Sequence, residues 1–284
     1  MQILGINFKS KAEREQDEKK YKERIFPGGE EEREKVCREL AKRLPGKDEK
    51  DLLMCYVHVR DRMTGAGLSF EQVKKETGLP VRTLIRPRFG DFLYTQYEHR
   101  QMLQDIRHFA QAGADGVVIG SLNADGTLNT EQMQEMMEAA GSCAVTMHRA
   151  FDVCADPFEA LKKSAELGVD TILTSGQEAD CFAGCGLLKK LVQLTDQSRS
   201  DSRRVTILAG GGVTSANIAE IAKKTGVRAF HMSGKRLLES GMRYRNERVH
   251  MGLGSLSEFE CYCTDEAEIR RAAEILRTLG EDGR

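Results

Sequence analysis

The sequence predicts an α/β fold: a TIM-type (β/α) barrel, incomplete at about six recognisable strands, with a helical segment at its N-terminus. Short apolar runs alternate with amphipathic stretches from about residue 66 onward, and the runs recur about every 25 to 35 residues. Each run ends in a polar or glycine-rich turn. Strands alternating with helices form parallel sheets, and repeated units that close on a glycine-rich loop favour a barrel over an open sheet.

Composition argues against two classes of partner. The 284 residues include 43 Lys and Arg against 44 Asp and Glu, so the excess of basic charge that binds nucleic acids or anionic membranes is absent. No apolar run approaches the roughly 18 residues that a membrane span requires. The charged N-terminus also lacks the apolar stretch of a secretory signal. We therefore expect a cytoplasmic protein, with no nucleic acid or membrane among its partners, in which the eight cysteines are mostly reduced.

The first 64 residues differ in composition and in apolar pattern from the rest of the chain. They are dominated by charge, and apolar positions such as Leu40 and Leu44 recur at helical spacing until Pro45 ends the pattern. A second short helix is expected after it. We therefore divide the chain into a helical segment over residues 1–64 and a barrel domain over residues 65–284.

Six apolar runs in the barrel domain are typical of strands, and five amphipathic stretches are typical of the helices between them. The expected strands are Val81–Ile85, Gly116–Ile119, Ala144–Met147, Thr171–Leu173, Val205–Leu208 and Ala229–Met232. The expected helices are Tyr97–Gln111, Thr130–Ala140, Pro157–Leu167, Leu187–Leu194 and Ser215–Lys224. Function collects at the carboxyl ends of parallel strands, so the polar residues after each strand are the candidate site.

The first candidate group follows the first expected strand. Arg86, Arg88 and Asp91 lie close together in the chain, and an extended backbone would point the two arginines the same way. Guanidinium groups in a cleft suit a phosphate or a carboxylate. The alternative is that they pair with Asp91 or with another acidic side chain at the barrel mouth.

The second group follows the third expected strand and consists of His148, Arg149 and Asp152. Near neutral pH a histidine can act as general acid or base or can bind a metal. His148 and Asp152 are therefore the candidate catalytic residues. The alternative is a structural histidine whose hydrogen bonds are satisfied by its neighbours.

Small residues follow the remaining strands. They are Ser175, the triple glycine Gly210, Gly211 and Gly212, and Ser233. Barrels often bind phosphate with backbone N–H groups after their last two strands, where glycine allows the ligand to approach closely. Ser175 could equally cap a helix, and the triple glycine could merely form a tight turn. The triple glycine and Ser233 follow the last two expected strands in this order, which favours a small anion as ligand.

Cys181 and Cys185 are weak candidates for a metal site. Soft thiolates select copper(I) or zinc, but the spacing lacks the paired pattern of a zinc site. Buried or free thiols are the default interpretation. Copper therefore remains an unproven cofactor on the residues alone.

Seven segments, in order, resemble the CutC family. They are Gly65–Leu68, Leu84–Tyr94, Asp115–Gly120, Val145–Asp152, Leu173–Gly176, Ala209–Val213 and Gly241–Asn246. From about residue 66 to the C-terminus the chain is thus identified as CutC-like. The resemblance implies a (β/α)8 barrel, a cytoplasmic location and an association with copper homeostasis, and it brings no secure enzymatic reaction. The residues that match the family at predicted strand ends are Arg86, Arg88, Asp91, His148, Arg149, Asp152, Ser175 and Ser233.

The N-terminus departs from this family pattern. The family begins with a strand, a helix and a second strand that ends in an Arg-x-Glu-Leu motif, and we find none of these in residues 1–64. The acidic side chain of that motif has no counterpart here. Either the N-terminal helices fill the two strand positions, or a partner chain does, or the chain is a fusion with impaired function. A homo-oligomer is left open.

Three functions follow from these patterns. The first is a CutC-like protein associated with copper homeostasis, with a site for a small anion or a metal at the barrel mouth. The second is an enzyme that acts on a phosphorylated or carboxylated small molecule, with His148 as acid or base. The third is a truncated or fused remnant without catalysis.

Overall fold

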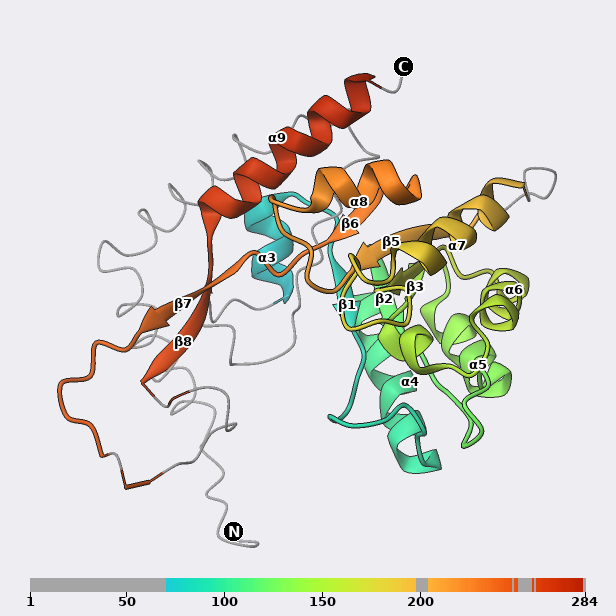
Figure 1. Cartoon of the computed structure of the whole chain (residues 1–284). Coiled ribbons are helices and arrows are strands. Elements are labelled where there is room, and N and C mark those ends of the chain that lie inside the picture. Colours follow the sequence, from blue (N-terminus) through green and yellow to red (C-terminus); the bar gives the residue numbers. More distant parts are fainter. Residues whose placement is uncertain (1–69, 198–203, 247, 250–256, 258, 283–284) are drawn as a thin grey trace, which may run out of the picture. The chain divides into compact units, whose positions relative to one another are not determined.

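The computed structural model describes residues 70–197, 204–246, 248–249, 257 and 259–282 (Figure 1). They belong to two compact units, one of which contributes α3 (Phe70–Thr77) and the other the residues from 80 onward. In α3, Phe70 and Val73 are buried. The two helices expected before residue 64 lie outside the described residues, and the division at residues 64 and 65 stays a prediction.

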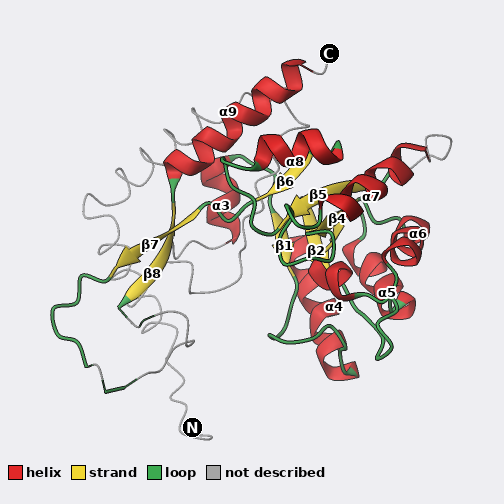
Figure 2. Ribbon diagram, in the orientation of Figure 1, coloured by secondary structure: helices red, strands yellow, loops and turns green. Residues whose placement is uncertain are grey.

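The second unit is built on a curled sheet of six parallel strands. These are β1 (Arg82–Leu84), β2 (Gly116–Ile119), β3 (Ala144–Met147), β4 (Thr171–Thr174), β5 (Thr206–Gly210) and β6 (Ala229–His231). Each strand pairs in parallel with the next, so the order in the sheet is the order in the chain. Among the described strands, β1 and β6 are the two edges. The sheet is therefore the incomplete TIM-type barrel that the sequence predicts (Figure 2).

Helices follow the strands and supply the other half of the core. They are α4 (Gln96–Gln111), α5 (Thr130–Ala140), α6 (Pro157–Leu167), α7 (Cys185–Gln197) and α8 (Ile218–Thr225), with a short 3-10 helix η1 (Arg149–Val153) after β3. Their buried positions recur three or four residues apart, as in Met102 and Ile106 of α4 and Leu188 and Leu191 of α7. One hydrophobic cluster joins these faces to the sheet.

Local signals explain where these helices begin and end. α4 starts in a capping box, in which Glu98 N–H donates to the Thr95 hydroxyl and the Glu98 carboxylate accepts from Thr95 N–H. α6 and α8 end at Gly168 and Gly226, which have φ angles of 86° and 76°. Only glycine takes these left-handed angles without strain.

The C-terminal part was not predicted from the sequence. β7 (Lys235–Glu239) and β8 (Glu260–Thr264) form an antiparallel pair, and α9 (Glu266–Asp282) follows. α9 packs beside α8 (Figure 1). The Asp265 carboxylate accepts the N–H groups of Ala267 and Glu268 and so caps the first turn of α9.

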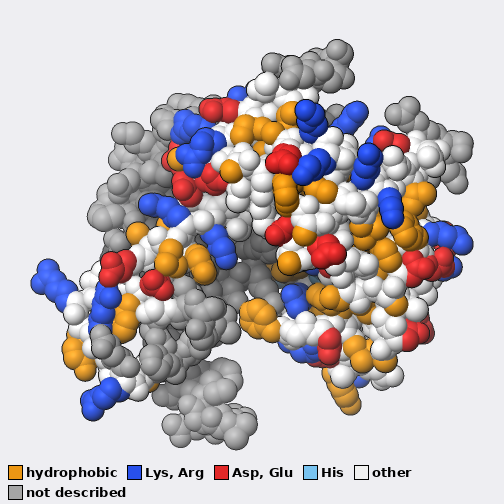
Figure 3. All heavy atoms as spheres, in the orientation of Figure 1, with side chains coloured by type: hydrophobic (Ala, Val, Ile, Leu, Met, Phe, Trp, Pro, Cys, Tyr) orange, Lys and Arg blue, Asp and Glu red, His pale blue; other side chains and the backbone are white. Residues whose placement is uncertain are grey.

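Figure 3 shows basic and acidic side chains interspersed on the face of the molecule that it draws. This pattern agrees with the near-zero net charge of the sequence. In the described part of the chain, every helix is too short or too polar to cross a bilayer.

Candidate functional site

A cavity of about 680 Å³ lies at the carboxyl ends of the parallel strands. Its lining comes from β1, from the loops after β3, β5 and β6, and from the start of α9. Among the predicted site residues it includes Arg86, His148, Arg149, Gly210, Gly211, Gly212 and Ser233. Residues from the two ends of the sheet order thus share one pocket, as expected for function at strand ends.

Four basic side chains line this cavity, and two of them were not predicted. Arg86 and Arg149 were expected, whereas Arg82 lies within β1 and Lys235 begins β7. Arg82 was missed because a residue inside a short apolar strand is expected to pack. Its guanidinium instead donates to the hydroxyls of Thr146 (2.5 Å) and Thr171 (3.4 Å) on two other strands.

Two carboxylates also line the cavity, and both are held by their own neighbours. Asp265 caps α9, as described above. Glu268 accepts from the N–H (2.6 Å) and the hydroxyl (2.8 Å) of Ser215 and pairs with Arg271 at 2.8 Å. The bond from the Ser215 N–H, with those from its hydroxyl and from Arg271, lowers the pKa of Glu268. The carboxylates are therefore held by hydrogen bonds around α9, while the basic groups come from β1 with the loop after it, from η1 and from β7.

Arg86 lies against Phe92 at the β1 side of the cavity. Its guanidinium carbon is 4.6 Å from the centre of the Phe92 ring, and one terminal nitrogen donates to the Gly90 carbonyl at 2.7 Å. Its Nε is buried and has no hydrogen-bond partner among the described residues. A buried donor of this kind is rare in folded proteins, so it marks a position where an acceptor is missing.

Arg88 has a different position from Arg86. It donates to the carboxylates of Glu98 (2.5 Å) and Asp91 (2.8 Å) and to the Leu93 carbonyl (2.8 Å), and it is outside the cavity lining. The expectation that both arginines point the same way is therefore wrong, because β1 ends at Leu84 and strand alternation stops there.

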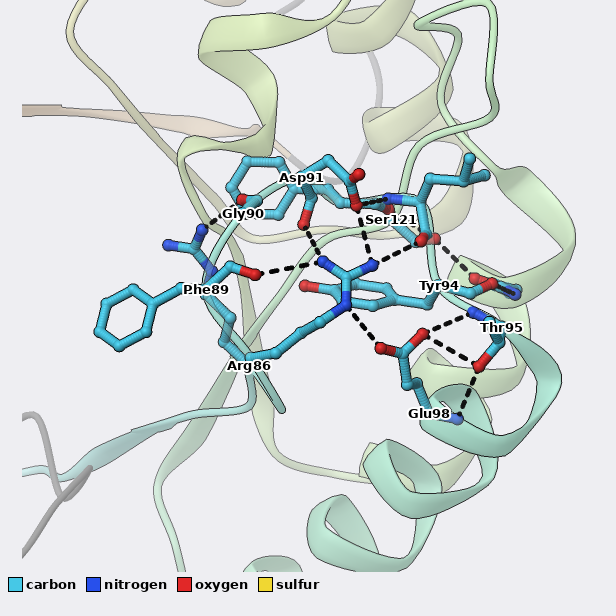
Figure 4. A network of polar contacts seen from close by, with 12 residues as sticks. Arg86, Phe89, Gly90, Asp91, Tyr94, Thr95, Glu98 and Ser121 are labelled. Atoms are coloured by element: carbon cyan, nitrogen blue, oxygen red, sulfur yellow. Dashed lines mark hydrogen bonds and ion pairs between the residues drawn. The ribbon is translucent and has the colours of Figure 1, made fainter.

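Asp91 belongs to the same loop network, which Figure 4 shows around Asp91, Thr95 and Glu98, with Phe89 projecting away from it. Its hydrogen bonds from Arg88 and from the Leu93 N–H lower the pKa of Asp91. The structure thus favours the pairing alternative for Arg88 and Asp91. Their contacts shape the loop that carries Phe92.

His148 is buried at the end of β3 and caps η1. Its Nδ1 accepts the N–H of Ala150 at 3.2 Å, and its ring lies 4.8 Å from that of Phe92. An added Cβ at Gly120 would be 2.6 Å from the imidazole, so the ring needs glycine beside it. Burial, with the charge of Arg86 as a second cause, lowers the pKa of His148 to about 3.

These contacts define the chemistry that His148 can perform. The ring is neutral at physiological pH, and because Nδ1 accepts a hydrogen bond, the ring proton is on Nε2. Nε2 is buried and has no partner among the described residues. A proton acceptor with so low a pKa is a weak general base near neutral pH, so the imidazole is suited to donating a hydrogen bond to a ligand.

The lowered pKa of His148 predicts how the free energy of unfolding depends on pH. In the unfolded chain His148 has its ordinary pKa of 6.5, whereas in the folded protein the value is about 3. The unfolded state therefore binds one more proton between these values, and stability is lost as the pH falls from 6.5. Between pH 6.5 and 5 we expect the stability of a His148→Gln variant to fall by about 1.6 kcal/mol less than that of the wild type, because the slope approaches about 1.4 kcal/mol per pH unit only below pH 6.5. Urea unfolding at both pH values measures the difference, and His108→Gln, at an exposed histidine, should behave as wild type.

Asp152 lies beside the cavity and organises its wall. Its carboxylate accepts from Arg149 Nε (2.6 Å), from the hydroxyl of Thr174 (2.5 Å) and from the N–H of Ser175 (3.0 Å). It also accepts from the N–H of Gln177. The side chain of Asp152 is 6% exposed and its lone pairs are occupied, so the structure supports a positioning role for this candidate catalytic residue.

Ser175 and Arg149 complete this wall. Arg149 donates to the Ser175 hydroxyl at 2.9 Å, and that hydroxyl in turn donates to the Glu178 carbonyl at 2.6 Å. An added Cβ at Gly211 would lie 3.6 Å from the Arg149 guanidinium. Arg149 thus reaches from the end of β3 across β4 to the glycine loop after β5.

The triple glycine forms a backbone surface at the other side of the cavity. Gly211 and Gly212 have φ angles of 128° and 68°, which residues with a Cβ rarely adopt. The N–H groups of Gly212 and Val213 make no hydrogen bond to another described residue. Backbone donors of this kind, next to Ser233 and Lys235, suit an anion.

Cys181 and Cys185 lie outside the cavity lining. Cys181 is fully buried, and burial, with Asp152 as the next cause, raises the pKa of its thiol to about 12. Cys185 is half-buried, donates to the Cys181 carbonyl at 3.4 Å, and has a pKa that burial also raises. A cysteine binds copper as its thiolate, which these raised pKa values disfavour, and the described residues contain no group of three or more His, Cys, Asp or Glu side chains placed to hold a metal ion. The two cysteines do not fit a copper site as they stand.

Comparison with known proteins places the chain in a family. The model of the CutC family matches residues 50–236, which is more than half of the sequence. The chain belongs to the CutC family. The match begins before residue 65 and ends before residues 241–246, which resemble the tail of CutC sequences.

Individual CutC proteins show the same relationship. A CutC family protein of Bacteroides fragilis is 45% identical over 197 residues, covering 69% of this chain and 76% of that protein. One of Bacteroides thetaiotaomicron is 49% identical over 172 residues, covering 61% and 67%. The crystal structure of CutC from Streptococcus agalactiae, whose name links it to copper homeostasis, has a TM-score of 0.53 and 29% identity. That match covers 57% of this chain and 77% of the other.

Proposed function

We propose that this CutC protein binds a small molecule bearing a phosphate or carboxylate in the cavity at the strand ends. One observation carries the proposal: four basic side chains from three parts of the chain line one pocket, and the two carboxylates in it accept hydrogen bonds from their own neighbours. In a cleft with apolar walls such as Leu84 and Leu173, guanidinium and ammonium groups attract anions strongly.

The glycine loop supports the same conclusion. Gly210–Gly212 and Ser233 follow β5 and β6, the last two strands of the parallel sheet. Backbone N–H groups at this position of a barrel bind phosphate without a side-chain charge. Lys235 lines the same cavity and supplies positive charge, and Arg149 approaches Gly211 while it stays paired with Asp152.

Copper is the second candidate ligand, and it is suggested by the family. The association with copper homeostasis comes from the name of the Streptococcus agalactiae relative, and the fit of Cys181 and Cys185 is poor for the reasons given above. Titration of the reduced protein with copper(I), compared with a Cys181→Ser/Cys185→Ser variant, tests whether these thiols take part. An unchanged stoichiometry would remove them as ligands.

The anion site is tested with inorganic phosphate in isothermal titration calorimetry. We expect Lys235→Gln to weaken phosphate binding about tenfold, because the loss of one charge-assisted hydrogen bond is worth roughly 1.5 kcal/mol. Lys224→Gln is the matched control, because each lysine lies over an aromatic ring: Lys235 4.0 Å from the centre of Tyr262 and Lys224 4.2 Å from that of Phe182. Only Lys235 lines the cavity. Equal losses in both variants, or no binding of phosphate or acetate by the wild type, would refute the proposal.

A further inference from the structure

Two buried nitrogen atoms at the β1 and β3 side of the cavity lack acceptors. They are Nε of Arg86 and Nε2 of His148, and neither has a hydrogen-bond partner among the described residues. Both side chains line the cavity and both contact the ring of Phe92. The charge of Arg86 acts on His148, so the two groups are electrostatic neighbours. Folded proteins rarely keep buried donors unpaired, so we expect each of these two N–H groups to donate to an acceptor atom of a ligand.

Both atoms can only donate. A guanidinium has no acceptor, and His148 has its proton on Nε2 because its Nδ1 accepts from Ala150. A cation is thereby excluded as the partner at this end, and an oxygen with lone pairs is required. The neutral imidazole is suited to an uncharged oxygen, and the adjacent guanidinium would favour negative charge that develops on it.

The other end of the cavity has a different character. Gly211, Gly212, Ser233 and Lys235 belong to the loops after β5 and β6, at the opposite end of the sheet order from β1. The two ends meet at Arg149, the residue after His148, because an added Cβ at Gly211 would lie 3.6 Å from its guanidinium. The apolar side chains of Val118 and Leu173 lie in the wall between them.

We propose that the ligand is a phosphorylated carbonyl compound of sugar-phosphate size, whose phosphate binds at the loops after β5 and β6 and whose carbonyl oxygen accepts from Arg86 and His148. This inference rests on the proposed anion site and adds a second contact point to it. The carbonyl is preferred to a hydroxyl because it only accepts, which matches two groups that only donate.

Three probes of equal chain length test this inference by calorimetry on the full chain. They are dihydroxyacetone phosphate, glycerol 3-phosphate and propyl phosphate, with inorganic phosphate as the reference. We expect dihydroxyacetone phosphate to bind at least about tenfold more tightly than propyl phosphate, because a site built to hydrogen-bond an oxygen rejects the analogue that lacks it. Equal affinities of the two would overturn the inference while leaving the anion site intact. Equal affinities of dihydroxyacetone phosphate and glycerol 3-phosphate would overturn the choice of a carbonyl.

Variants assign the effect to the two nitrogens. His148→Phe should reduce the preference for dihydroxyacetone phosphate over propyl phosphate to less than about twofold, and His148→Gln, which keeps an N–H donor, should restore part of it. Arg86→Lys removes Nε but keeps the positive charge, so it should retain phosphate binding and lower the same preference; it decides the matter if His148→Phe fails to fold. An unchanged preference in Arg86→Lys and His148→Phe would contradict the assignment. Failure of inorganic phosphate to bind the wild type would instead refute the underlying anion site.

Discussion

Replacing Asp152 by alanine is expected to lower the free energy of unfolding by about 3 kcal/mol or more. The carboxylate accepts hydrogen bonds from Arg149, Thr174, Ser175 and Gln177, and alanine would leave the buried donors of Thr174 and Ser175 without this acceptor. Each unsatisfied buried donor costs about 1–3 kcal/mol, and part of this is recovered by relaxation of the exposed Arg149. Urea unfolding at pH 7 measures the loss.

Asp156→Ala is the matched control for this change. Asp156 lies four positions further along the chain and accepts the N–H groups of Phe158 and Glu159 at the start of α6. The loss of such a helix cap costs about 1 kcal/mol. If Asp152→Ala were no more destabilising than Asp156→Ala, the carboxylate would not be the organiser of the cavity wall. Asp152→Ala should also weaken phosphate binding, because Arg149 loses the hydrogen bond to Asp152 that positions its guanidinium at the cavity.

Gly184→Ala is expected to destabilise the protein by about 3 kcal/mol. Gly184 lies directly before α7, where its backbone packs on the loop after β4. An added Cβ would overlap the carbonyl oxygen of Ser175 and would lie 2.9 Å from the Cα of Gly176. Because both neighbours are backbone atoms, the clash cannot be relieved by a side-chain rotation, and overpacking of this kind costs about 1–3 kcal/mol or more.

Gly186→Ala provides the opposite result two residues later. Gly186 lies inside α7, and an added Cβ there would meet no atom within 4 Å. Alanine is favoured over glycine in a helix by roughly 1 kcal/mol, so this variant should be more stable than the wild type. Thermal and urea unfolding of both variants give the comparison. A similar effect of the two substitutions would show that the close packing of Gly184 on Ser175 is not decisive.

The parallel sheet could be predicted because its strands are short apolar runs with sharp ends. The expected bounds of Gly116–Ile119 and Ala144–Met147 agree with β2 and β3, and the helix bounds of Thr130–Ala140 and Pro157–Leu167 agree with α5 and α6. These helices begin at capping side chains and end at glycine, which are local signals that tertiary structure did not override.

The C-terminal elements were missed for two different reasons. All five residues of β7 are exposed, so the strand has no alternation of buried and exposed side chains for the sequence to display. α9 did carry a signal, since Ile269, Ala272, Ala273 and Leu276 recur at helical spacing and three of the four are buried. A search for this spacing beyond the last strand would have found the helix and its two cavity residues, Asp265 and Glu268.

The candidate site was only partly accessible from the sequence. Strand ends could be located from the apolar runs, and Arg86, His148 and the triple glycine that follow them line one pocket. The separation of Arg88 from Arg86 depends on a turn and on the carboxylate of Glu98, ten residues away in the chain. The neutral state of His148 depends on its burial, which no residue beside it in the chain reveals.

The side chain of Arg82 has a mechanical consequence for the sheet. From β1 it reaches hydroxyls on β3 and β4, strands with which β1 shares no ladder. It therefore links three strands of the described sheet from the side that faces the cavity. Such a tie between strands that are not neighbours opposes flattening of the sheet, so one side chain supports both the curvature and the pocket.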